Sequence, residues 1–244
     1  MSLYGLIGKK LSHSFSKKYF TEKFEKEGLH TCKYELYELA SADELPQLIR
    51  TTPDLAGLNV TIPYKEDVIP LLDDIHEKAR EIGAVNVIKI RDGKLTGYNS
   101  DYFGFRESLA NWIGESKVKA LVLGTGGASK AVIAALKDLG IPYQVVSRQA
   151  SNENLSYTSL KEAPELIRDH RLIINTTPLG MHPQTDAAPD LDYSLLSNKH
   201  FLYDLVYNPE VTQFLSKGLD QRASIKNGIE MLHLQAEKSW EIWN

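Results

Sequence analysis

The chain has 244 residues, a net charge of −4 and an apolar fraction of 42%. This length predicts one large or two small domains, and the composition is that of a globular protein and excludes general disorder. A single cysteine, Cys32, excludes an internal disulfide scaffold. Charges of both signs are spread evenly, so we expect no nucleic-acid partner, and no apolar run approaches the roughly 18 residues of a membrane span. The default expectation is a cytoplasmic protein.

The first hundred residues alternate between strand and helix patterns. Short apolar or alternating runs predict strands at 3–7, 32–39, 55–60, 84–90 and 95–99. Helices are predicted from Ser14 or Ser16 towards residue 26, at 41–50 with a capping box of Ser41 and Glu44, at 64–72, and ending near Gly83. Asp-Gly at 92–93 indicates a hairpin between the last two strands, which makes the first sheet mixed.

From Tyr102 onward the pattern is typical of a doubly wound parallel sheet. Continuous apolar runs predict buried strands at 119–123, 143–147, 172–175 and 201–204. Helices are predicted at 102–112, at 129–139, from a capping box of Ser159 and Glu162 to about 169, and at 228–243, with an exposed loop at 183–197. We therefore predict an α/β protein with two domains, one of residues 1–101 plus 228–244 and a Rossmann-like one of residues 102–227.

The run Gly-Thr-Gly-Gly-Ala-Ser at 124–129 has a dinucleotide-binding pattern. It follows a strand and opens a helix, so Gly124 permits a tight turn and Gly126 lets the backbone approach a pyrophosphate at the helix N-terminus. The next strand ends in Arg148, at a position where NAD enzymes place an acidic residue. A guanidinium there favours a 2′-phosphate, and therefore NADP. The alternatives are a turn without a ligand and a solvated surface arginine.

Polar residues gather at a predicted strand end of the first domain. In Asn59-Val-Thr-Ile-Pro-Tyr-Lys65, Asn59 and Thr61 alternate, so their side chains point the same way. Lys65 falls in the first turn of the predicted 64–72 helix, where the helix dipole opposes a cation. This unfavourable placement suggests a catalytic use as an acid or base, and an ordinary exposed lysine is the alternative.

Two further motifs have both a structural and a functional interpretation. The hydroxyls of Ser12-His-Ser-Phe-Ser16 stand at a predicted helix start, where they would bind a carboxylate or simply cap the helix. Asn99-Ser-Asp101 follows a predicted strand, and Asp101 would cap the next helix, act in catalysis, or do both.

These motifs, in this order and spacing, resemble the shikimate dehydrogenase family over nearly the whole chain. The matching runs are SHSFS at 12–16, NVTIPYK at 59–65, GAVN at 83–86, NSD at 99–101, GTGGA at 124–128, NTTPLGM at 175–181, YNP at 207–209, NGIEML at 227–232 and QA at 235–236. The resemblance implies reversible, NADP-linked reduction of 3-dehydroshikimate to shikimate in aromatic amino-acid biosynthesis. The first domain would bind the substrate and the Rossmann-like domain NADP.

The resemblance also implies a role for each matching residue. Lys65 would be the catalytic lysine and Asp101 its partner. The substrate would be bound by Ser14, Ser16, Asn59, Thr61, Lys65, Asn86, Asp101, Tyr207 and Gln235. NADP would be bound by Gly124, Gly126, Gly127, Ala128, Ser147, Arg148, Asn175, Thr176, Met181, Gly228 and Met231. The chemistry requires no metal, and the expected assembly is a monomer or a homodimer.

Some positions depart from the family pattern. Lys17 stands where the family usually has proline, Tyr102 where it has glycine, and Ser147 and Gln149 flank Arg148 where it has asparagine and threonine. Two alternatives therefore stay open. One is a quinate/shikimate dehydrogenase with broader substrate or NAD use, because discrimination of one hydroxyl depends on pocket shape. The other is a catalytically silent NADP-binding module, which would require a degraded acid–base pair.

Overall fold

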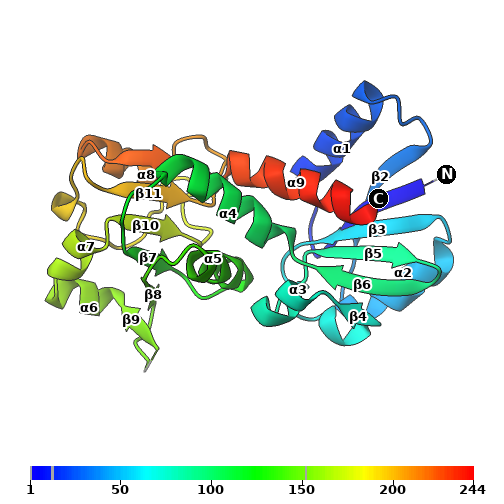
Figure 1. The fold of residues 1–244 in the computed structure, drawn as a ribbon, viewed down its shortest axis with the longest axis horizontal. Coiled ribbons are helices and arrows are strands. Elements are labelled where there is room, and N and C mark those ends of the chain that lie inside the picture. The colour runs from blue at the N-terminus through cyan, green and yellow to red at the C-terminus, as the bar shows by residue number, and fades with distance from the viewer. Residues whose placement is uncertain (1, 12–13, 152) are drawn as a thin grey trace. The chain divides into compact units, whose positions relative to one another are not determined.

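The computed structural model describes residues 2–11, 14–151 and 153–244. The chain divides into two compact units, Met1–Ser100 with Gln235–Asn244, and Asp101–Leu234. Each unit contains a six-stranded sheet with helices on both faces (Figure 1). The helix near the C-terminus, α9 (Ile229–Trp243), is divided between the units after residue 234. Among the described residues, none of the helices combines the length and apolarity needed to cross a membrane.

The first unit has the mixed sheet that the sequence predicts. The strand order is β2-β1-β3-β5-β6-β4, in which β1 runs parallel to β2 and β3, and β5 runs antiparallel to β3 and β6. Asp92 and Gly93 both have positive φ, 52° and 77°, which confirms the predicted hairpin turn. The strands are β1 (Ser2–Gly8), β2 (Cys32–Glu38), β3 (Leu55–Val60), β4 (Asp74–Ile75), β5 (Val87–Arg91) and β6 (Lys94–Tyr98).

Aromatic packing joins the helices on one face of this sheet. Helix α1 (Phe15–Lys26) and the C-terminal part of α9 enclose a cluster that includes Phe20, Tyr34 and Trp243. Helices α2 (Leu45–Thr51) and α3 (Glu77–Ile82) pack on the other face around Leu58 and Ile88. Alternate residues of each strand point to opposite faces, so both layers are supplied by the same strands.

The predicted helix at 64–72 is wrong. Residues 62–68 form turns, and only a short 3-10 helix, η2 (Ile69–Leu71), follows them. Pro70 contributes to the difference, because proline has no amide hydrogen to bond to the carbonyl four residues earlier and so interrupts a helix through 64–72. Lys65 therefore does not lie in the first turn of a helix, and the dipole argument for its function fails.

Both predicted capping boxes also differ from the structure. Ser41 caps a 3-10 turn, η1 (Ala42–Glu44), by accepting from the amide of Asp43 at 3.2 Å, and α2 begins only at Leu45. In the second case the box consists of Ser156 and Ser159, so the helix starts three residues earlier than the sequence predicts. Before the second helix the run Ser-Tyr-Thr-Ser at 156–159 offers three serine or threonine residues, and composition alone does not select the one that caps.

The second unit has the predicted parallel, doubly wound sheet, in the order β12-β11-β10-β7-β8-β9. Its strands are β7 (Ala120–Leu123), β8 (Tyr143–Ser147), β9 (Asn154–Ser156), β10 (Leu172–Asn175), β11 (Phe201–Asp204) and β12 (Ser224–Lys226). The order reverses between β7 and β10, and ligands of such sheets bind beyond the strand ends at that point.

Helices cover both faces of this second sheet. Helices α4 (Ser100–Ile113), α5 (Gly127–Asp138) and the start of α9 pack on one face. Helices α6 (Tyr157–Glu162), α7 (Glu165–Asp169) and α8 (Gln213–Asp220) pack on the other, and a 3-10 turn, η3 (Tyr193–Leu195), lies within the predicted loop. Four elements were not predicted from the sequence, namely β4, β9, β12 and α8, and the three strands among them have at most three residues each.

Candidate active site

The polar motifs of the first unit meet at one edge of its sheet. Asn59 near the end of β3 pairs with Val87 at the start of β5, and Val87 pairs with Tyr98 at the end of β6. The amide of Thr61 donates to the carbonyl of Ile7 at 3.0 Å, which places the end of β1 beside them. Because β5 is antiparallel to its neighbours, residues before β5 and after β6 reach the same edge as Asn59.

A network of neutral side chains lies at this edge. The Tyr34 hydroxyl donates to Asn59 Oδ1 at 2.8 Å, and Asn59 Nδ2 donates to Ser239 Oγ at 2.9 Å. The hydroxyls of Ser239 and Ser100 are 3.1 Å apart. Asn86 donates to Ser100 Oγ at 3.0 Å and accepts from the Ser100 amide at 2.7 Å. Both asparagines are buried, so the protein's own hydrogen bonds fix their orientation.

Three other predicted substrate residues adjoin this network within the first unit. Gln235 is buried, and its Oε1 accepts from the Ser100 hydroxyl at 3.3 Å. The backbone carbonyl of Lys65 accepts from the Val85 amide at 2.7 Å, which holds the turn of Lys65 next to the Asn86 segment. Thr61 and Lys65 are both half-buried.

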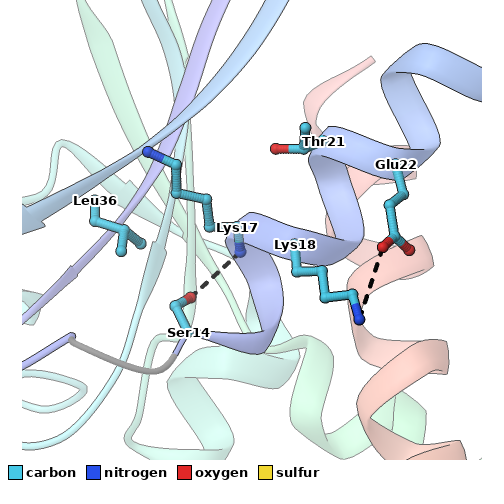
Figure 2. Close-up of a pocket in the computed structure, with 6 residues that line it drawn as sticks. All are labelled: Ser14, Lys17, Lys18, Thr21, Glu22 and Leu36. Atoms are coloured by element: carbon cyan, nitrogen blue, oxygen red, sulfur yellow. Dashed lines mark hydrogen bonds and ion pairs between the residues drawn. The ribbon is translucent and has the colours of Figure 1, made fainter.

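Ser14 and Ser16 lie at the start of α1. Ser14 is the capping residue, since its Oγ accepts from the Lys17 amide at 3.3 Å (Figure 2). The Ser16 side chain hydrogen-bonds the Tyr34 hydroxyl, which connects α1 to the network. Lys17 pairs with Glu35 of β2 at 2.6 Å and borders a surface pocket of about 400 Å³ (Figure 2). Ser12 and His13 of the same predicted motif lie outside the described residues.

Two predicted substrate residues belong to the second unit. Helix α4 begins at Ser100, so Asp101 lies in its first turn and is not the capping residue. A carboxylate in the first turn interacts favourably with the helix dipole. Tyr207 is half-buried, and this burial raises the pKa of its hydroxyl.

The glycine loop of the second unit fits a pyrophosphate. Gly124 has a φ of +113°, and a Cβ there would lie 2.7 Å from Thr176 Oγ1, so the position excludes side chains. Gly126 caps α5 without any side-chain hydrogen bond, and a Cβ on it would meet open space. The first amides of α5, from Gly127 and Ala128, therefore have no side-chain cap to compete with an anion.

Thr176 and Asn175 hold the neighbouring loop against the glycine loop. The amide and the hydroxyl of Thr176 both donate to the Leu123 carbonyl, at 3.0 and 2.7 Å. Asn175 is fully buried, donates to Asp204 Oδ1 at 2.9 Å, and accepts from the amide and hydroxyl of Thr177. The Asn175 side chain thus holds the conformation of the loop that follows it.

The remaining predicted cofactor residues divide into packed and exposed ones. Met231 lies in the core cluster of α4 and α5, and a Cβ on Gly228 would lie 2.2 Å from the Leu205 carbonyl, so Gly228 allows close backbone packing. The Ser147 hydroxyl donates to the Gln149 carbonyl. Met181 is 47% exposed, and Arg148 is exposed and, within the described part of the chain, has no ion-pair partner.

Asp204, the last residue of β11, is a functional candidate that the sequence motifs do not indicate. Its carboxylate is fully buried and accepts from Asn175, from the Val206 amide at 3.0 Å and from the Thr212 hydroxyl at 2.6 Å. Burial raises the pKa of Asp204 to about 6. An acidic residue directly after an apolar strand run was the available signal for this site.

The doubly wound sheet, its glycine loop at the start of α5 and the polar edge of a second α/β unit define the class of two-domain dinucleotide-binding proteins. The family model of the shikimate dehydrogenase substrate binding domain matches residues 6–88. The shikimate dehydrogenase (NADP(+)) of Clostridium beijerinckii is 42% identical over 100% of this chain and 92% of its own length. The chain therefore belongs to the shikimate dehydrogenase family, and the resemblance found in the motifs is confirmed.

Solved structures of a shikimate and a quinate dehydrogenase are similar to this chain over its full length. Shikimate 5-dehydrogenase from Thermus thermophilus, in complex with NADP(H) and shikimate, matches with a TM-score of 0.88 and 30% identity, over 100% of this chain and 94% of that one. Quinate dehydrogenase from Corynebacterium glutamicum, in complex with NAD, matches with a TM-score of 0.88 and 26% identity, over 100% and 93% of the two chains.

Proposed function

We propose that this protein catalyses the reversible, NADP-dependent reduction of 3-dehydroshikimate to shikimate in aromatic amino-acid biosynthesis. The observation that carries the proposal is the polar edge of the first unit, where amide and hydroxyl groups gather beside the turn that holds Lys65. Shikimate is a small ring with several hydroxyls and one carboxylate, and its recognition requires neutral hydrogen-bonding groups and one anion site. The family relationship over the full chain supports the same activity.

In this proposal the first unit supplies most of the substrate contacts. Ser14 and Ser16 at the start of α1 bind the carboxylate, since a helix N-terminus with hydroxyl groups favours an anion. The ring hydroxyls are bound by Asn59, Thr61, Asn86 and Asp101, and Tyr207 and Gln235 complete the substrate site. The positions of Asn59, Asn86 and Gln235 within one buried network support this assignment.

Lys65 acts as the acid–base group. NADPH, when bound, supplies the hydride. The protonated amine of Lys65 stabilises the negative charge that develops on the carbonyl oxygen and then donates its proton to that oxygen. In the reverse direction the neutral amine accepts the proton of the substrate hydroxyl. Asp101 orients Lys65, an assignment that rests on the family motif alone.

The second unit binds NADP. The uncapped start of α5 and the closed turn at Gly124 support binding of the pyrophosphate. Arg148, which directly follows β8, pairs with the 2′-phosphate in this proposal, and the exposure of its side chain supports this role. Gly127, Ala128, Ser147, Thr176 and Met181 line the cofactor path, whereas Asn175, Gly228 and Met231 shape it through packing.

Steady-state kinetics with shikimate and quinate, each with NADP and NAD, test this proposal. The highest kcat/KM is expected for shikimate with NADP. The second candidate, quinate with NAD, is favoured by the similarity to the quinate dehydrogenase structure and by Ser147 and Gln149 beside Arg148. A higher kcat/KM for that pair would replace the first proposal, and tight NADP binding without turnover would indicate a silent module.

Substituting Lys65 tests the chemical step. Lys65→Ala is expected to lower kcat by roughly 10² to 10⁴, the usual contribution of a positioned acid–base group, with the KM for NADP unchanged. Lys33→Ala, which removes an exposed lysine of β2, is the matched control and should keep its rate. A Lys65→Ala enzyme with undiminished kcat at neutral pH would remove Lys65 from the mechanism.

We also propose a cytoplasmic location and a monomeric or homodimeric state. The thiol of Cys32 is free, as is usual for proteins of a reducing compartment. Sedimentation equilibrium over a range of concentrations would separate the two assemblies, and a larger oligomer would contradict both.

A further inference from the structure

The amide group of Asn59 has a single orientation in the network. Its Nδ2 donates to Ser239 Oγ at 2.9 Å and to the Asn86 carbonyl at 3.4 Å, which uses both amide hydrogens. The Ser239 hydroxyl donates its own hydrogen to the Gln235 carbonyl at 2.8 Å, so it can only accept from Asn59. Two acceptors therefore face Nδ2, and the side-chain carbonyl oxygen of Asn59 points away from them.

Tyr34 fixes the other side of this amide. Its hydroxyl donates to Asn59 Oδ1 at 2.8 Å, and its ring is buried and stacked on Phe20 at a centroid distance of 4.7 Å. Burial strongly raises the pKa of this hydroxyl, so it stays a protonated donor across the working range of an enzyme. The same hydroxyl also interacts with Ser16, so one buried tyrosine connects two of the proposed substrate-binding segments.

We propose that Tyr34 and Ser239 are positioning residues that orient the Asn59 amide for substrate binding, so that its carbonyl oxygen accepts from a ring hydroxyl. The inference rests on the proposed function. One lone pair of Asn59 Oδ1 accepts from Tyr34, and the second would accept from the ring hydroxyl. If the amide rotated by half a turn, an N–H donor would replace this acceptor, and Nδ2 would face the Tyr34 hydroxyl instead of its two acceptors.

Two conservative substitutions test the inference. Tyr34→Phe keeps the ring stack and removes the hydroxyl, and Ser239→Ala removes the acceptor at a helical position that tolerates alanine. Each is expected to raise the KM for shikimate by about tenfold, with the KM for NADP unchanged. Tyr203→Phe is the matched control, because Tyr203 is a buried tyrosine of the second unit that donates to Ser108 Oγ at 2.9 Å. It should lower the melting temperature without changing the KM for shikimate.

The double variant separates positioning from general destabilisation. If Tyr34 and Ser239 act through one amide, Tyr34→Phe combined with Ser239→Ala should raise the KM by little more than either change alone. A multiplicative rise of about a hundredfold would overturn the inference, and so would an unchanged KM in both folded single variants.

A measurement without substrate keeps the inference distinct from the proposed function. In the ligand-free protein, hydrogen exchange of the Asn59 side-chain amide, followed by NMR, should become at least several-fold faster in Ser239→Ala and in Tyr34→Phe. Exchange that is unchanged in both variants would contradict the network. Failure of the wild-type protein to oxidise shikimate would instead contradict the proposed function and leave this result standing.

Discussion

Each unit has a buried polar network where strands of its sheet end, and the two networks differ in charge. The network of Asn59 and Asn86 in the first unit consists of amides and hydroxyls only. The network in the second unit is centred on the carboxylate of Asp204, whose hydrogen-bond partners Asn175, Val206 and Thr212 are all uncharged groups. A neutral network keeps its hydrogen bonds at any physiological pH, whereas a buried carboxylate makes stability depend on pH.

The two networks also contact different parts of their units. In the first unit the network adjoins Lys65 and Gln235 at an edge that we propose to bind the substrate. In the second unit Asp204 and Asn175 direct their hydrogen bonds to the backbone and side chains of loops 176–179 and 206–212. The first network therefore adjoins the edge that we propose to bind the substrate, whereas the second holds loops 176–179 and 206–212.

The largest expected effect comes from removing the Asp204 carboxylate. Asp204→Ala leaves the buried donors of Asn175, Val206 and Thr212 without an acceptor and should lower the free energy of unfolding by about 3–5 kcal/mol. Urea denaturation at pH 7 measures this change. Asp220→Ala, at an exposed position at the end of α8, should change it by less than about 0.5 kcal/mol. A cost for Asp204→Ala below about 1 kcal/mol would mean that the network contributes little.

A second, smaller effect is a pH dependence confined to the charged network. The pKa of Asp204 is raised from 3.8 to about 6, so the folded state binds more protons than the unfolded state between these values. The stabilising contribution of the protonated group is complete below about pH 4 and is lost as the pH rises through about 6. At about 1.4 kcal/mol per pKa unit, the loss amounts to about 3 kcal/mol.

Asp204→Asn isolates this dependence. Asparagine keeps an acceptor for Asn175 and Val206, and its amide can donate to the Thr212 hydroxyl, so the fold should be retained. The difference in unfolding free energy, wild type minus variant, should fall by about 2 kcal/mol between about pH 4 and pH 7, which is most of the full change. A difference that stays constant over this range would show that Asp204 titrates at its usual pKa in the folded protein.

The regions that the sequence predicted well are those where one local pattern determines the structure. The apolar run before Gly124 and the Asp-Gly pair at 92–93 specify a buried strand and a hairpin, and both are present. The prediction of a helix at 64–72 was wrong because apolar spacing does not register Pro70, which lacks the amide hydrogen that the interior of an α-helix requires.

The networks themselves could not be predicted from local patterns. Tyr34, Asn59 and Ser239 lie on β2, β3 and α9, and 25 and 180 residues separate the bonded pairs along the chain. The motifs predict that Asn59 binds the substrate, but only the fold shows that a tyrosine and a serine hold its amide. The motifs likewise predict Asn175 as a cofactor residue, and only the fold shows that its side chain is buried and donates to Asp204.

The smallest expected effect comes from removing an exposed cation. Unlike the buried networks, this side chain should affect cofactor binding and not stability. Arg148 at the end of β8 is exposed, so its removal should leave the free energy of unfolding within about 0.5 kcal/mol of the wild type. Arg148→Gln is expected to raise the KM for NADP by about tenfold, equivalent to about 1.4 kcal/mol, and to leave the KM for NAD unchanged, because only NADP carries the 2′-phosphate. Arg168→Gln, at another exposed arginine of the same unit, is the control for a general loss of positive charge.

Because exposed ion pairs are screened, the difference in KM between NADP and NAD should shrink as the salt concentration rises. An equal rise in KM for both cofactors would show that Arg148 shapes the loop after β8 and does not select the phosphate.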